Sequence, residues 1–123
     1  MGSRDALHVV MRRFGQRVRI RNAVRLWKKG NSGEPKVVEI MTFSGVAVRV
    51  EKPCEWLRLF DDVYLLFKDE EIGYVVAEWC DSCKSATVVA ELNAMTRRVF
   101  YERSKVFFGL ALGLAVERKL VRF

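Results

Sequence analysis

Apolar and cationic residues alternate along one stretch near the start of the chain. Between Arg17 and Trp27, apolar side chains occupy alternate positions and arginines occupy most of the positions between them. The apolar residues are Val18, Ile20, Val24 and Leu26, and the arginines are Arg17, Arg19, Arg21 and Arg25. A period of two places such residues on opposite faces of a β-strand. The pattern predicts a long strand with a cationic outer face, followed by a turn over the glycine-rich residues 28–34.

Five further runs have the composition of short β-strands. Residue types that favour strands are concentrated in residues 37–41, 46–50, 63–67, 73–79 and 85–92. Pro53 ends the second of these runs, and we interpret residues 54–62 as a connection. Its inward-facing side chains are predicted to be Trp56, Leu57 and Phe60. Six strands separated by turns predict a closed antiparallel barrel, because closure removes exposed sheet edges.

The character of the chain changes at about Asn93, where helix-forming residues replace the glycine and proline punctuation of a sheet. Asn93 or Thr96 is available as the N-cap of a C-terminal helix. Its segment Val106–Val116 is apolar on nearly every side, so either its own domain covers it fully or an oligomer or partner covers the remainder. The side chains proposed for such an interface are Phe107, Phe108, Leu110 and Leu112.

These patterns together predict a mainly β fold, a six-stranded antiparallel β-barrel with a C-terminal α-helix. The chain has 123 residues, of which 50% are hydrophobic and 30% are charged, so one core can form without disulfides or metals. Residues 1–11 are predicted to form an N-terminal arm, residues 12–92 the barrel, and residues 93–123 a helix that packs on the barrel or on a partner.

The charge balance favours an anionic partner. Lys and Arg number 22 against 15 Asp and Glu, giving a net charge of +7, and much of the excess lies in the first thirty residues. Phosphate-bearing ligands, nucleic acid and an anionic membrane surface all fit this balance, as does a merely solvated basic face. The odd cysteine count and the lack of a signal-peptide pattern predict a cytoplasmic protein, and no apolar run is long enough for a membrane span.

An arginine-rich segment precedes the first predicted strand. It reads Arg12-Arg13-Phe14-Gly15-Gln16-Arg17 and contains the spacing R-x-x-x-R. Residues 12–92 resemble the PilZ domain family, in which a paired-arginine loop leads into the first strand of a six-stranded barrel. The resemblance implies binding of cyclic di-GMP, with Arg13 and Arg17 on guanine and phosphate and Arg12 as a third cation. Planar guanidinium groups suit both kinds of acceptor.

The second motif of that family, [D/N]-x-S-x-x-G, is degenerate in this chain. Counting back from Gly45 places Thr42 where the family has serine and Ile40 where it has an acidic or amide side chain. Glu39 lies one position too early and faces the other side of the strand, unless a bulge changes the register. Ser44 and Gly45 keep the elements of a tight turn. Loss of one buried polar contact predicts affinity weakened by about one to two decades, or lost.

Catalytic and metal-binding constellations are not apparent in the sequence. Cys80 and Cys83 form a C-x-x-C pair, but no second pair accompanies it, so two turn thiols that bridge under oxidation are favoured over a zinc site. The carboxylates at 61–62 and 69–71 and the single His8 have no neighbouring nucleophile. We therefore predict a protein that is not an enzyme and that has no cofactor or metal.

Three hypotheses for function follow. The first is a PilZ-like regulatory signalling module that binds cyclic di-GMP through Arg12, Arg13 and Arg17, with contributions from Glu39, Thr42, Ser44 and Gly45. The second is a PilZ-like adaptor or homo-oligomer that works through its C-terminal helix without the nucleotide. The third is a barrel that binds single-stranded nucleic acid through stacked aromatic residues and arginines.

Overall fold

The computed structural model describes residues 3–82 and 84–122, and this part of the chain is mainly helical. Its elements, in order, are α1 (Ser3–Gly15), α2 (Arg17–Lys28), β1 (Val37–Met41), β2 (Ala47–Glu51), α3 (Pro53–Leu66), α4 (Glu71–Asp81), α5 (Ala86–Leu92) and α6 (Arg97–Glu117). The predicted six-stranded β-barrel is therefore wrong, since six helices and one two-stranded sheet account for the described elements. Residues 3–11, predicted to form part of an N-terminal arm, belong to α1.

The predicted first strand is helix α2. Ile20 and Val24 are buried, whereas Leu26 is 68% exposed. A spacing of four residues suits both an alternating strand and one face of a helix, because two strand periods and one helical turn nearly coincide. The alternation was thus an ambiguous signal, and the helix turns Leu26 away from the core.

Helices also replace the other three strands predicted outside the hairpin. Residues 63–67 end α3, residues 73–79 lie in α4, and residues 85–92 form the N-cap and body of α5. In α3, Pro53 stands at the first turn, where its missing N–H costs nothing. The buried side chains that follow recur at helical spacing: Trp56, Leu59, Phe60 and Val63.

Two predictions are confirmed locally. The runs at 37–41 and 46–50 form an antiparallel hairpin in which Val38 pairs with Val50 and Ile40 with Val48. The last helix is capped by Thr96, whose side chain accepts a hydrogen bond from the backbone N–H of Val99.

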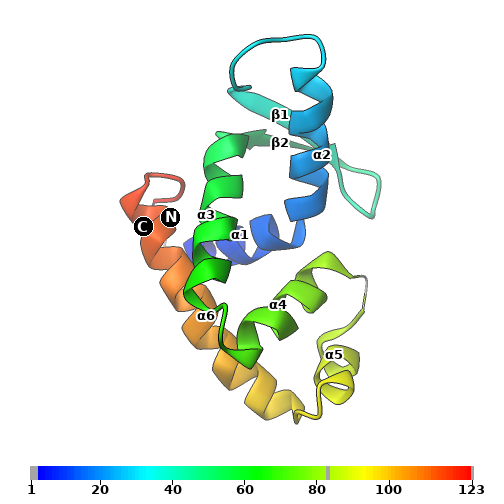
Figure 1. Ribbon diagram of the computed structural model, residues 1–123, viewed down its shortest axis with the longest axis vertical. Helices are drawn as coiled ribbons and strands as arrows, with labels where there is room; N and C mark the ends of the chain where they lie inside the picture. The colour runs from blue at the N-terminus through cyan, green and yellow to red at the C-terminus, as the bar shows by residue number, and fades with distance from the viewer. Residues whose placement is uncertain (1–2, 83, 123) are drawn as a thin grey trace.

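The hairpin lies toward one end of the molecule, and the long helix α6 runs from the other end along one side (Figure 1). Helix α2 packs on β1 and α3 at one end, α4 and α5 lie at the other end, and α6 contacts α1, α3, α4 and α5. The core is centred on Phe14, whose ring lies 4.6 Å from that of Phe60 and 5.5 Å from those of Phe107 and Phe108.

The interface predicted on the last helix needs correction. Phe107 and Phe108 are buried in the chain's own core at 0% and 2% exposure, so they are not available to a partner. Leu110 is 42% exposed and Leu112 is partly buried. The helix therefore packs Phe107 and Phe108 on its own domain, but Val106 (66% exposed) and Leu110 stay exposed, so its own domain does not cover it fully. Among the described residues, no helix combines the length and the apolar character that crossing a membrane requires.

Candidate anion-binding site

The arginine pair singled out in the sequence is split by an elbow between two helices. Helix α1 ends at Gly15 and α2 begins at Arg17, with the buried Gln16 between them. In a continuous helix, residues four apart would share one face. The elbow instead directs Arg13 and Arg17 into two different clefts that have no lining residue in common.

Arg13 lies in a cleft between α1, β2, the start of α3 and the C-terminal turn. This cleft, which we call the basic cleft, has a volume of about 600 Å³. Its charged lining residues are Arg13, Arg49, Lys52, Lys119, Arg122 and Glu51. Five cations minus one carboxylate give the described lining a formal charge of +4. Its apolar lining consists of Val9, Trp56, Leu120 and Val121.

Arg13 is the most enclosed cation of the basic cleft. One of its terminal nitrogens donates a 2.8 Å hydrogen bond to Oε1 of Gln16, and its Nε is buried without a partner among the described residues. Burial, and secondly the charge of Arg12, lower the pKa of Arg13 from its ordinary value. A bound anion would offset both effects, because it favours the charged form of the guanidinium.

Two lysines close the basic cleft at strained backbone positions. Lys52 has a φ of 51° and Lys119 a φ of 59°, a left-handed region that residues other than glycine seldom adopt. The ammonium group of Lys52 approaches the carbonyl oxygen of Lys119 at 3.5 Å, which links the hairpin side of the cleft to the C-terminal turn. Lys52 is also the N-cap of α3, so the positive end of that helix dipole lies beside the cleft. The charges of the two lysines and the dipole of α3 add to the positive potential of the basic cleft.

On the other side of the elbow, the charge of Arg17 is balanced by a carboxylate. It donates a 2.6 Å hydrogen bond to Asp81 on α4, and its guanidinium lies 5.1 Å from the centre of the Tyr64 ring. Burial opposes the charge of Arg17, but the hydrogen bond and charge of Asp81 outweigh it and raise the pKa of the guanidinium. Asp61 acts in the same direction. Arg17 thus already has its counter-ion.

The other predicted ligand residues are dispersed. Arg12 is exposed and lies outside the basic cleft. Glu39 is exposed and pairs across the sheet with Arg49. The hydroxyl groups of Thr42 and Ser44 lie 2.9 Å apart in the hairpin turn, where Gly45 takes a φ of 81°. Of the seven predicted positions, Arg13 alone lines the basic cleft.

The cleft residues that sequence reasoning missed come from two segments far from Arg13 in the sequence, 49–52 and 119–122. They are Arg49, Lys52, Lys119 and Arg122. Only the fold brings them to Arg13, so no local motif announced the site.

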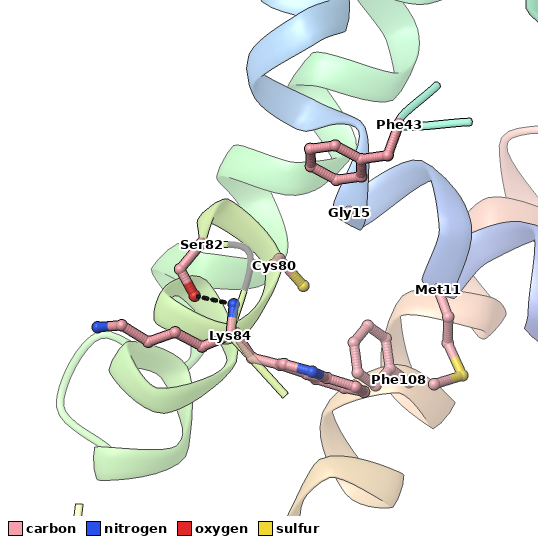
Figure 2. A pocket seen from close by; sticks show the side chains of 8 residues that line it. Met11, Gly15, Phe43, Cys80, Ser82, Lys84 and Phe108 are labelled. Atoms are coloured by element: carbon pink, nitrogen blue, oxygen red, sulfur yellow. Dashed lines mark hydrogen bonds between the residues drawn. The ribbon is translucent and has the colours of Figure 1, made fainter. Parts of the chain in front are cut away.

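A third cleft, of about 310 Å³, lies between the hairpin tip and the end of α4 (Figure 2). In Figure 2, Phe43 and Phe108 face this space from opposite sides, while the chain of Lys84 extends away from it. Burial, and secondly Asp81, raise the pKa of Cys80 to about 12, so its thiol stays protonated at neutral pH. This cleft therefore lacks an activated thiol at Cys80.

The remaining chemical candidates stay dispersed as well. Cys83, the second thiol of the predicted C-x-x-C pair, lies outside the described residues. In residues 3–82 and 84–122, no three side chains of the His, Cys, Asp or Glu type gather as a metal ion would require. His8 is exposed on α1.

Comparison of the chain with protein-family models, with curated proteins and with solved structures finds no match. The barrel that the PilZ resemblance implied is not the fold of this chain, and the arginine segment leads into a helix and not into a strand.

Proposed function

We propose that this protein binds a phosphate-bearing ligand in the basic cleft. The observation that carries the proposal is the gathering, among the described residues, of five cations and one carboxylate around a single open cleft. Like charges brought together within one cleft repel each other, and the described residues supply Glu51 as their sole carboxylate there. An anionic ligand would remove that repulsion.

The cleft has the size and composition of a ligand site. Its volume of about 600 Å³ falls within the range of pockets that hold small molecules. Trp56 and Val9 give it an apolar wall, while guanidinium groups can hold phosphate oxygens in a planar, bidentate manner. A nucleotide or another organic phosphate matches this combination better than a bare inorganic anion does.

Cyclic di-GMP is one member of this ligand class and remains a specific proposal for this chain. The elbow at Gln16 separates Arg13 from Arg17, so a binding mode that needs both side chains on one ligand is disfavoured. Binding of cyclic di-GMP would instead engage Arg13 with Arg49 and the two lysines.

Titration calorimetry with pyrophosphate, ATP and cyclic di-GMP tests the proposal. The Arg13→Ala variant should bind its ligand about tenfold or more weakly, because charge-assisted hydrogen bonds contribute about 1.5–3 kcal/mol each. Arg12→Ala is the matched control, since it removes the same charge from the adjacent residue outside the cleft. Equal losses in both variants, or no heat with any of the three ligands, would overturn the proposal.

A further inference from the structure

A second cationic surface lies away from the basic cleft. Between Asp5 and Glu34 the chain contains no carboxylate. Eight cations fall in that interval: Arg12, Arg13, Arg17, Arg19, Arg21, Arg25, Lys28 and Lys29. Six of them belong to α2 or to its C-cap. The helix is therefore strongly cationic in its own right.

Helix α2 is destabilised by its own charges. Arg21, Arg25 and Lys29 follow one another at intervals of four residues, and each like-charged pair at this spacing costs about 0.2–0.5 kcal/mol. Within the described part of the chain, Arg17 is the cation of α2 that forms an ion pair. The other cations of α2 therefore repel one another, and an anionic partner would relieve this repulsion.

The hairpin tip adds an exposed aromatic residue to this surface. Phe43 is 78% exposed, and the guanidinium of Arg19 lies 3.9 Å from the centre of its ring. Figure 1 shows the loop between β1 and β2 projecting beside α2. This cation–π contact holds the hairpin tip against α2 and leaves Phe43 exposed at the edge of the cationic face.

We propose that α2 and the hairpin tip form a surface that binds double-stranded DNA. The surface consists of Arg19, Asn22, Arg25, Lys29 and Phe43, and we call it the α2–hairpin surface. An α-helix is about 10–12 Å wide with its side chains, which matches the major groove of B-DNA at about 12 Å. Arg25 and Lys29 would neutralise phosphates, and the exposed Asn22 would face base edges.

This inference does not depend on the basic cleft, because none of the five residues of the α2–hairpin surface lines it. The charge of a nucleic acid backbone complements an extended cationic helix, whereas the basic cleft, at about 600 Å³, has the size of a small ligand. The two proposals can therefore fail separately.

Fluorescence anisotropy with a labelled duplex of about 20 base pairs, at about 50 mM salt and above, tests the inference. The triple variant Arg19→Ala, Arg25→Ala, Lys29→Ala should bind about tenfold or more weakly. Its slope of log affinity against log salt should become shallower by about 0.9 for each lost phosphate contact. The single variant Phe43→Ala leaves every charge of α2 in place and should also weaken binding.

A matched control removes the same charge from α6. The variant Arg97→Ala, Arg98→Ala, Lys105→Ala changes three exposed cations elsewhere, and its affinity should fall by less than about twofold. Arg13→Ala should leave duplex affinity unchanged, and the α2 triple variant should leave binding of the small phosphate ligand unchanged. Equal losses in the two triple variants, no binding at low salt, or stronger competition by single-stranded RNA than by duplex DNA would overturn the inference.

Discussion

Arg13 and Arg17 are four residues apart, yet Arg13 lies mainly among other cations and Arg17 lies beside carboxylates. Arg13 shares its cleft with Arg49, Lys52 and two further cations, whereas Arg17 is held at 2.6 Å by Asp81. Burial acts against the charge of both arginines. The difference is the counter-ion, which the fold supplies to one and withholds from the other.

The contrast separates a structural cation from a binding cation. Arg17 joins α2 to α4, and its pair with Asp81 is a contact between elements. Arg13 has only the neutral Gln16 as a hydrogen-bond partner in the described chain, so its charge has no counter-ion there and its second terminal nitrogen is left to a ligand. Residue type alone does not make this distinction, because the two side chains are identical.

The largest effect is expected from truncating Phe14, the aromatic residue that anchors the elbow in the core. Phe14 is fully buried and its ring packs against four others, those of Phe60, Tyr64, Phe107 and Phe108. Phe14→Ala should lower the free energy of unfolding by about 3–5 kcal/mol, because it opens a cavity at the centre of the core. Urea denaturation followed by circular dichroism measures this loss. A decrease below about 1 kcal/mol would show that the elbow is held elsewhere.

Part of this fold could be predicted from the sequence, and the physical reason is locality. The hairpin at 37–50 and the cap at Thr96 depend on turn and cap residues within a few positions, so local chemistry determines them. The segment 17–27 misled because Ile20 and Val24 satisfy the periods of strand and helix alike. A usable signal was overlooked after Pro53, where large apolar residues recur every three or four positions without a glycine until Gly73.

The candidate site was harder to predict than the fold. Arg13 was identified from its position in an arginine-rich segment, but its partners Arg49, Lys52, Lys119 and Arg122 are brought to it by tertiary packing. The expected pairing with Arg17 failed because a single residue, Gln16, changes the direction of the chain between two helices. The expected pairing assumed a loop that leads into a strand, whereas the chain has an elbow between two helices at this point.

The next largest effect is expected on the free energy of unfolding at alkaline pH. Burial raises the pKa of Cys80 from 9.0 to about 12, so the unfolded chain loses this proton at lower pH than the folded chain does. Stability is therefore complete below about pH 9 and should fall toward pH 12 by about 1.4 kcal/mol per unit. Tyr64, whose pKa is also raised by burial, adds to the fall above pH 10. Denaturation under reducing conditions at several pH values measures the slope.

Cysteine variants provide the control for this titration. Cys80→Ala should flatten the slope strongly. Cys54→Ala should flatten it less, because Cys54 has a smaller rise in pKa, caused by burial and by Glu34. Equal slopes in the wild type and in Cys80→Ala would contradict the assignment of this pH dependence to Cys80.

The smallest effect should come from making Arg17 resemble Arg13. Asp81→Asn removes the counter-ion while keeping the size of the side chain, and it should lower the free energy of unfolding by about 1 kcal/mol at low salt. The loss should shrink as salt increases, because added ions screen the pair. Asp62→Asn is the matched control, since it breaks the 2.7 Å pair with Arg118, in which Asp62 is 50% exposed compared with 29% for Asp81. If the two variants lose the same stability, the partial burial of the Arg17 pair gives it no advantage, and the counter-ion does not distinguish the two sides of the elbow energetically.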